Sequence, residues 1–334
     1  MNENPDVIQS APEADAIFAS VVTGDLPISH PSIPLPSGRT TCRAGHPVLP
    51  RDRRVPPDGE TYSPMATGAG SSKVIFVLGA SDPEMARIEA LLGECGRTVA
   101  KATVNGRRVA PSLAYRADGT DPAIPRGADV VCIECQVAGI TPTVVIDHHR
   151  PGDPGYGKGP EDYWAASSIG QLYAMLPDAT PAAEDRLIAA ADHCLGHAYQ
   201  GRCPGVDPDA LRAWRTASRA AFQRCTKEEI EWQVDGAIAT LQNLPTVMVA
   251  GQSVANAMFM SPIPEAPEAS AITGIALMYS MVDRATGRMK VGLLGAEPAT
   301  IREWMERNAL EMGLVEVYGD PARGFAGAYV RLTK

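Results

Sequence analysis

Two of the six histidines of the chain are adjacent, in the segment VVIDHHRPGDPGYG at residues 144–157. Asp147, His148 and His149 directly follow an apolar run there. One interpretation is a polar turn that happens to contain two imidazoles, and the other is a metal site at the end of a strand. Carboxylates and imidazoles bind Mn²⁺, Fe²⁺ and Zn²⁺, and such a metal activates water and neutralises phosphate oxygens. Because a buried strand rarely ends in three adjacent ionisable groups, the pattern favours the metal site.

Other potential ligands follow apolar runs or lie on an apolar helical segment in the same part of the chain. They are Asp82 and Glu84 in GASDPEM, Glu134 in VVCIECQ, and Asp192, His193 and His197 in AAADHCLGHAYQG. In sheets of parallel strands, ligands bind beyond the carboxyl ends of the strands. We therefore expect several of these residues to share one site with His148.

The first of these segments also has a structural interpretation. Residues 81–84 read SDPE, which combines a capping residue, a proline in the first turn and an acidic residue three positions after the serine. That combination is typical of a helix start. Helix capping and metal ligation therefore fit Asp82 and Glu84 equally well.

The remaining candidates differ in how well a structural role fits them. Glu134 could be a solvated strand end, but its position at a strand tip favours ligation. Asp192 lies on an apolar helical segment, where an unpaired carboxylate is costly, so ligation is favoured there too. His193 and His197 lie four residues apart on one helix face, where packing or solvent exposure fits better than a second ligand pair.

The elements that must position these residues alternate between strands and helices from residue 73 onward. Short continuous apolar runs predict strands covered on both faces, and stripes at helical spacing predict helices between them. The predicted strands are 74–78, 130–133 and 144–146, and the predicted helices begin near 83, 167 and 183. This alternation predicts an α/β domain with a mostly parallel sheet over residues 73–205.

Two further regions follow this predicted domain, and one region precedes it. Residues 206–243 read as a helical linker of two helices, the second opening with the capping-box segment TKEE at 226–229. Residues 244–334 alternate strand-like runs with one helix from 298 to about 312, which predicts a second, smaller α/β domain. Residues 1–72 contain eleven of the 29 prolines and predict a partly irregular extension. Cys42 and His46 could be half of a zinc site there, but no second pair follows at zinc-finger spacing, which favours an incidental loop.

Composition and charge exclude several classes of function. The net charge of −9 argues against binding to duplex nucleic acid, which needs a basic face. No apolar stretch is long enough to cross a bilayer and the N-terminal segment is acidic and polar, so we expect a cytoplasmic protein without a membrane partner. Seven cysteines without regular spacing indicate reduced thiols.

Three segments together resemble the DHH phosphoesterase superfamily. They are IDHH at 146–149 after an apolar strand, AASSIGQL at 165–172, which is similar to the family's ASS-containing helix start, and GDPARGFAG at 319–327. The last is similar to the glycine-rich GGGHxxAAG substrate loop of the associated DHHA1 domain. The resemblance covers roughly residues 73–334, and it implies a DHH-type domain followed by a DHHA1-like substrate-binding domain.

The first motif of the family departs most strongly from the pattern. Ala80 stands where the family has a histidine. Glu84 and Ala86 stand where it has two aspartates, and Asp82 is an extra carboxylate that could substitute. The resemblance therefore implies a divergent member with a degenerate first motif.

The other motifs imply a metal site. Glu134 takes the place of an aspartate that bridges two metals, and His148 and Asp192 match the ligands of the second metal. His149 would lie near the scissile phosphate, as a ligand or a general acid. One ion held by Glu134, His148 and Asp192, with Asp82 or Glu84 helping, is more economical than two. Mn²⁺ is the expected metal, with Fe²⁺ or Zn²⁺ as alternatives.

Phosphate recognition has its own candidates. Guanidinium groups and helix N-termini both suit phosphate oxygens. The predicted substrate-binding residues, in addition to Arg150 beside the histidines, are Ser167, Ser168, Arg323, Gly324 and Gly327. Ala322 replaces the histidine of the family's loop, so the contact would pass to Arg323. Lys158 is a weaker candidate, and any of these basic residues could simply be solvated.

The sequence thus predicts a metal-dependent phosphoesterase that hydrolyses a small nucleotide or a short single-stranded oligonucleotide with metal-activated water. His149, Arg150 and Asp147 form its expected catalytic group, with the first two stabilising charge on the leaving oxygen. The alternative is a degenerate DHH protein that binds a nucleotide or a protein partner without hydrolysis. A homodimer is compatible with either.

Overall fold

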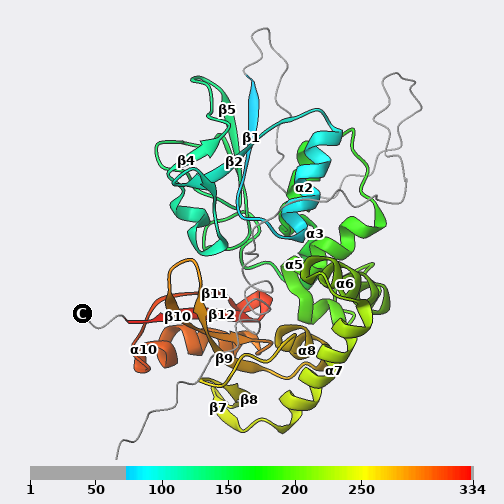
Figure 1. Ribbon diagram of the computed structural model, residues 1–334, viewed down its shortest axis with the longest axis vertical. Coiled ribbons are helices and arrows are strands. Elements are labelled where there is room, and N and C mark those ends of the chain that lie inside the picture. The colour runs from blue at the N-terminus through cyan, green and yellow to red at the C-terminus, as the bar shows by residue number, and fades with distance from the viewer. Residues whose placement is uncertain (1–72, 332–334) are drawn as a thin grey trace, which may run out of the picture.

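A computed structural model describes residues 73–331, which form two six-stranded sheets with helices around them (Figure 1). The proline-rich extension, Cys42 and His46 lie outside the described residues. Both sheets combine with helices, as the predicted α/β class requires. The proposed domain boundaries near residues 205 and 244 stay a prediction.

The first sheet has a parallel centre in the order β2-β1-β5-β6. Its strands are β1 (Val74–Leu78), β2 (Thr98–Val104), β5 (Asp129–Ile133) and β6 (Val144–Ile146). Two short strands, β3 (Arg107–Arg108) and β4 (Gly119–Asp121), pair antiparallel with β2. The three strands predicted from continuous apolar runs are confirmed. Strand β2 was not predicted, because it reads TVAKATV and only part of it is buried.

Helices cover this sheet and complete its core. They are α2 (Pro83–Glu94), η1 (Pro111–Arg116), η2 (Pro160–Asp162), α3 (Tyr163–Ala166), α4 (Ser168–Met175) and α5 (Ala183–Tyr199). Apolar side chains of α2, α4 and α5 pack with those of β1 and β5 in one core cluster. That packing places the carboxyl ends of β5 and β6 beside α5. The candidate ligands lie at these strand ends and on α5.

Two long helices lead to the second sheet. Helix α6 spans Pro208–Gln223 and helix α7 spans Lys227–Asn243. The predicted capping box is confirmed: Thr226 Oγ1 accepts a hydrogen bond from Glu229 N, and the Glu229 carboxylate accepts one from Thr226 N.

The second sheet runs in the order β11-β12-β10-β9-β8-β7 and is antiparallel except between β8 and β9. Its strands are β7 (Thr246–Val249), β8 (Gln252–Ala257), β9 (Leu277–Asp283), β10 (Arg288–Leu294), β11 (Leu314–Asp320) and β12 (Phe325–Val330). The connecting helices are α8 (Ala266–Thr273), α9 (Pro298–Glu303), the π-helical turn η3 (Trp304–Asn308), α10 (Ala309–Glu311) and η4 (Pro321–Arg323). One face of the sheet packs on Trp304 and its neighbours. The opposite face packs in part on α7 and α8 and in part lines a cavity.

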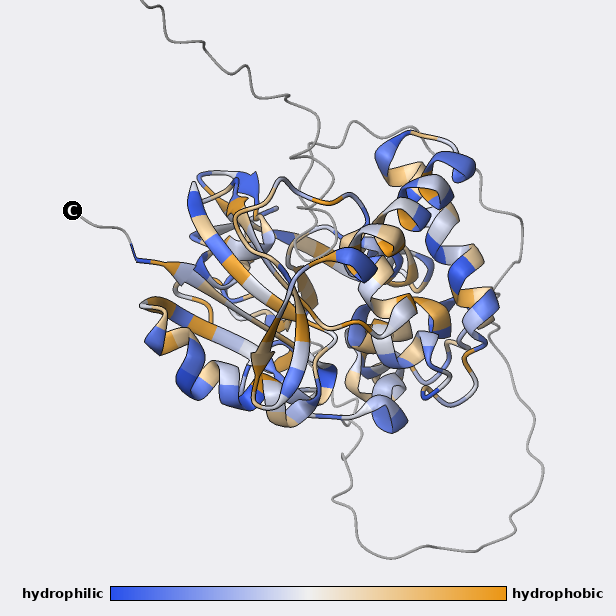
Figure 2. Ribbon diagram, turned by 90° about the horizontal axis from the view of Figure 1, so that it is seen from below, coloured by the Kyte–Doolittle hydropathy of each residue, from blue (hydrophilic) through white to orange (hydrophobic). Residues whose placement is uncertain are grey.

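Hydropathy follows this layering, since hydrophobic residues concentrate in the strands and on the inner turns of the helices (Figure 2). None of the helices within residues 73–331 is both long and apolar enough to cross a membrane.

Candidate metal centre

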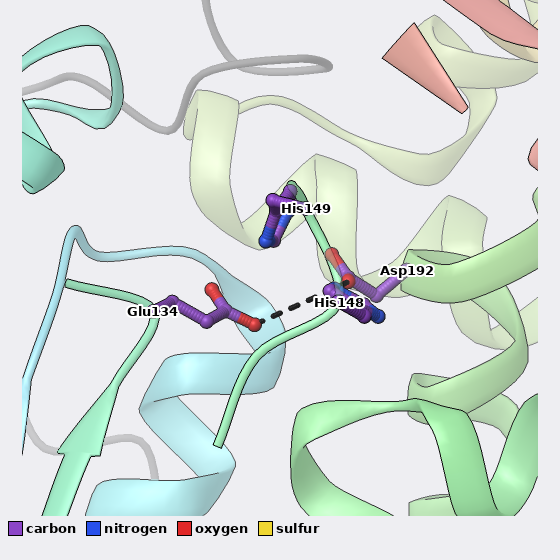
Figure 3. Close-up of side chains that lie close together, drawn as sticks. All are labelled: Glu134, His148, His149 and Asp192. Atoms are coloured by element: carbon purple, nitrogen blue, oxygen red, sulfur yellow. Dashed lines mark ion pairs between the residues drawn. The ribbon is translucent and has the colours of Figure 1, made fainter. Parts of the chain in front are cut away.

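Four side chains that could bind a metal converge beyond the carboxyl ends of β5 and β6. Glu134, His148, His149 and Asp192 each offer one ligand atom, and these atoms all lie within 4.8 Å of one another. Figure 3 shows Glu134 and Asp192 directed toward His148, with His149 beside them. Sequence reasoning placed all four in one site, and the structure brings them together.

The backbone explains this convergence. Strands β5 and β6 are parallel neighbours, with Ile133 paired to Ile146, so the residues that follow them emerge side by side. Glu134 has a left-handed conformation (φ 50°), which turns the chain immediately after β5. A Cβ on Gly79 would lie 2.3 Å from the Glu134 carbonyl oxygen, so only glycine allows β1 to end this close to the site. Asp192 comes from α5, two residues before Cys194, where the helix is kinked.

Three buried atoms at the centre face one another without hydrogen bonds. His148 Nε2 lies 3.0 Å from Asp192 Oδ2 and 3.5 Å from Glu134 Oε1. Within the described residues none of these three atoms has a partner with hydrogen-bond geometry. Buried polar atoms are almost always satisfied, so a group that contacts all three is needed here.

A chain of hydrogen bonds fixes which nitrogen of His148 carries its proton. His193 Nε2 lies 3.1 Å from the carbonyl oxygen of Lys158, which can only accept, so that nitrogen is the donor. The other nitrogen of a neutral His193, Nδ1, is then an acceptor for His148 Nδ1, 2.9 Å away. Burial and the nearby Arg323 lower the pKa of His148 to about 3 and that of His193 to about 2, so both rings are neutral. The lone pair of His148 Nε2 consequently points at two carboxylates.

A divalent cation fits this donor set. A nitrogen lone pair beside two carboxylate oxygens is repulsive unless a positive charge lies between them, and mixed N and O ligands suit Mn²⁺, Fe²⁺ or Zn²⁺. Burial raises the pKa of Glu134 to about 8, assisted by Asp82 and Asp192, although His149 opposes the shift. For Asp192, burial is outweighed by His148 and Arg323, and its pKa is lowered. Ionising Glu134 in this cluster is thus unfavourable, and a bound cation would stabilise its ionised form.

Asp82 and Glu84 lie at the edge of the cluster and also accept hydrogen bonds from the first turns of α2 and α4. Asp82 Oδ1 caps α2 by accepting a hydrogen bond of 2.7 Å from Met85 N. Glu84 Oε1 accepts one from Ile169 N at the start of α4, while its Oε2 has no partner among the described residues. Burial and Asp192 raise the pKa of both carboxyl groups, that of Asp82 to about 7. They line the cavity but do not join the four-residue group.

His149 is held by Asp147 rather than left free to rotate. Its Nδ1 lies 3.0 Å from Asp147 Oδ1, and the Tyr115 hydroxyl donates to the same carboxylate at 3.0 and 3.1 Å. Burial opposes protonation of His149, but Glu134 and Asp147 outweigh it and raise its pKa to about 9. Burial likewise opposes ionisation of Asp147, and the hydrogen bond from His149 outweighs it, giving a pKa of about 2. His149 is therefore a cation at neutral pH, with Nε2 free to donate, and Asp147 positions it.

The centre opens into a cavity of about 840 Å³ between the two sheets. Arg150 lines it, with its guanidinium carbon 3.7 Å from the Tyr115 ring centroid. Its Nη1 contacts Gln136 Oε1 at 3.4 Å. This stacked arginine presents positive charge beside the metal centre, as a phosphate contact requires.

Arg323 reaches the metal centre from the second sheet and binds its backbone. Its Nη1 donates to the His148 carbonyl at 3.1 Å, Nε to the His193 carbonyl at 2.7 Å and Nη2 to the Asp192 carbonyl at 2.9 Å. Arg323 also lines the cavity. It holds the segments that carry three site residues in one arrangement, a role that sequence reasoning did not assign to it.

Of the other predicted substrate contacts, Gly324 alone lines the cavity. Ser167 and Ser168 are fully buried and do not line it; Ser167 instead caps α4 by accepting from Gly170 N. Gly324 lines the cavity in a left-handed conformation (φ 74°). Gly327 lies within β12, beneath the ring of Tyr318. The Lys158 side chain is exposed, and only its carbonyl takes part in the site.

No family model matches the chain, and no curated protein matches it. Among solved structures, it is similar to the pGpG-specific phosphodiesterase PggH from Vibrio cholrae, with 11% sequence identity and a TM-score of 0.38 over 78% of this chain and 94% of that chain.

Proposed function

We propose that this protein is a metal-dependent phosphoesterase that acts on a small nucleotide or a short oligonucleotide. The observation that carries the proposal is the convergence of the unpaired His148 Nε2, Glu134 Oε1 and Asp192 Oδ2 beside a cationic His149. The resemblance of the DHH segment to the phosphoesterase superfamily points to the same chemistry.

Glu134, His148 and Asp192 would hold the ion. A divalent ion bound there supplies positive charge and activates water for attack on phosphorus. The metal is proposed to be Mn²⁺, with Fe²⁺ or Zn²⁺ as alternatives that the same donor set accepts.

The chain's own residues provide the remaining steps. His149, protonated and fixed through Nδ1 by Asp147, can give its Nε2 proton to the leaving oxygen as a general acid. Arg150 stabilises the negative charge that develops on the phosphoryl oxygens. The position of both residues beside the cavity allows a substrate phosphate to contact them together with the ion.

Metal content and turnover test the proposal. Wild-type protein should take up about one Mn²⁺ or Zn²⁺ per chain, measured by elemental mass spectrometry after dialysis, and should hydrolyse members of a panel of phosphorylated dinucleotides. His148→Ala should lose both properties. For metal uptake His197→Ala is a matched control, because His197 lies outside the four-residue group. A wild-type protein that binds neither metal would contradict the proposal and favour a non-catalytic nucleotide-binding protein.

A further inference from the structure

Two buried cysteines contact each other beside the segment that carries Asp192 and His193. Cys194 belongs to α5, Cys203 lies in the turn after it, and each is 2% exposed. Their sulfur atoms are 2.8 Å apart, across nine positions of the chain. A disulfide bond is about 2.05 Å long, so a shift of less than about 1 Å would bring the two sulfur atoms to bonding distance. The spacing of the cysteines in the sequence did not indicate this pair.

The turn after α5 holds Cys203 in place. Arg202 N donates a hydrogen bond of 2.9 Å to the His197 carbonyl, which folds the chain back along the helix. The Tyr163 hydroxyl donates to the Pro204 carbonyl at 3.3 Å, so the residue after Cys203 is anchored as well. Both cysteines also belong to the core cluster of the first sheet. The contact between the sulfur atoms is therefore part of the packed structure.

Cys194 is also the residue at which α5 is kinked. Its backbone has non-helical angles inside the helix (φ −150°, ψ 49°). Asp192 and His193 directly precede it, and the carbonyls of both accept hydrogen bonds from Arg323. The geometry of the kink thus affects how α5 presents Asp192 to His148. A covalent bond at Cys194 would fix that geometry from the core side of the helix.

We propose that Cys194 and Cys203 are an oxidative modification site, at which hydrogen peroxide converts the two thiols to a disulfide that fixes the kink of α5. One sulfur attacks a peroxide oxygen, the O–O bond breaks, and a sulfenic acid and one water form. The other sulfur then attacks the sulfenic sulfur, which forms the S–S bond and releases a second water. The two thiols lose two electrons and two protons in total, and the peroxide is reduced to two waters. A thiol reductant reverses the reaction by exchange.

The position of the pair allows a small oxidant to reach it. His193 and Leu195, on either side of Cys194, both line the cavity. Local opening of the kinked segment would therefore expose Cys194 to solvent in the cavity. Because both thiols are buried, we expect the reaction to be slow. The site goes beyond the proposed function, since its chemistry needs neither a metal nor a substrate.

Peptide mapping of the wild type tests the disulfide without any variant. The metal-free protein is treated with hydrogen peroxide, its remaining thiols are alkylated, and it is digested with trypsin, which cleaves after Arg202 between the two cysteines. We expect the peptide of residues 187–202 to be joined to the peptide that begins at Cys203. Dithiothreitol should separate the two, because it reduces a disulfide but not a sulfinic acid. Oxidised protein in which these two peptides are not joined would overturn the proposal.

Hydrogen exchange tests whether the disulfide fixes the kink. Amide exchange in residues 187–202 should be slower in oxidised than in reduced wild type, both without metal. Cys203→Ser removes the bonding partner of Cys194 with little change in size, so its exchange should be the same with and without peroxide. Cys225→Ser, at a half-buried cysteine outside the pair, is the matched control and should respond to peroxide as wild type does. A joined pair of peptides with unchanged exchange in residues 187–202 would refute the effect on the kink.

Discussion

The guanidinium group of Arg323 donates a hydrogen bond to the backbone carbonyl of His148, 175 positions earlier in the chain. Two more bonds from the same side chain reach the carbonyls of Asp192 and His193. A residue of the second sheet therefore orients the backbone of the metal centre without being one of its ligands.

Replacing Arg323 should weaken metal binding. In Arg323→Ala the backbone segments of His148 and Asp192 lose their common anchor, and we expect about 10- to 100-fold lower Mn²⁺ affinity, as is typical for residues that orient ligands. Calorimetric titration of metal measures this. Arg302→Ala, on the exposed side of α9, is the control. A variant with unchanged metal affinity but raised KM would show that Arg323 acts on the substrate instead.

The hydrogen-bond chain through His193 predicts a similar loss. His193→Ala removes the acceptor of His148 Nδ1, so the ring of His148 is free to change tautomer or rotate. Mn²⁺ affinity should fall about 10- to 100-fold while the fold persists, which circular dichroism can check. Retention of full metal affinity would mean that His193 serves only packing.

The pairing of Asp147 with His149 predicts a shift in pH dependence. Asp147→Asn removes the charge that helps to raise the pKa of His149 to about 9. The pKa should fall toward the ordinary value of 6.5, as followed by NMR titration of the imidazole. Because the protonated ring is the proposed acid, the alkaline limit of turnover should move to lower pH. An imidazole that titrates as in wild type would contradict this coupling.

Metal binding should strengthen as pH rises. The pKa values of Asp82 and Glu134, about 7 and 8, lie above their ordinary values of 3.8 and 4.5. In the folded metal-free protein these two carboxyl groups hold protons that they release in the unfolded chain, so their contribution to the free energy of unfolding decreases as pH rises from about 4 to 8. Mn²⁺ competes with those protons.

The increase in Tm caused by Mn²⁺ should therefore be larger at about pH 8 than at about pH 6. Glu134→Gln should show a smaller increase in Tm that depends less on pH. An increase in wild type that is the same at both pH values would contradict the assignment of Glu134.

The close approach of Gly79 to the Glu134 carbonyl predicts a cost in stability. Gly79→Ala would force its Cβ to within 2.3 Å of that oxygen, and the backbone must shift. We expect a decrease of about 1–3 kcal/mol in the free energy of unfolding, measured in urea. Gly93→Ala on α2, whose added Cβ meets no atom within 4 Å, should not be destabilising.

The sequence predicted those parts of the structure that local patterns determine. Continuous apolar runs located β1, β5 and β6, and the residues after them supplied Glu134 and His148. The helix predicted to begin near residue 183 is α5, which begins at Ala183. By contrast β8 and α8 were missed, because QSVANA and APEASAIT contain small residues without a strong period.

The contacts that orient the site depend on distant residues and could not be read from spacing. His148 meets His193 across 45 positions, and Asp147 meets Tyr115 across 32. A buried histidine on an apolar helix and a tyrosine in a 3₁₀ turn carry no signal of these partners. The local pattern for His193 favoured packing or exposure, and only the geometry reveals its bond to His148.

The three hydrogen bonds of Arg323 also have a consequence for when the metal centre can form during translation. Residues 134–192, which contain the four candidate ligands, leave the ribosome well before residue 323 exists. Contacts of such long sequence separation form late in folding. A nascent chain should therefore carry the four candidate ligands before Arg323 is present to orient their backbone. We expect tight metal binding only after the second sheet has been synthesised.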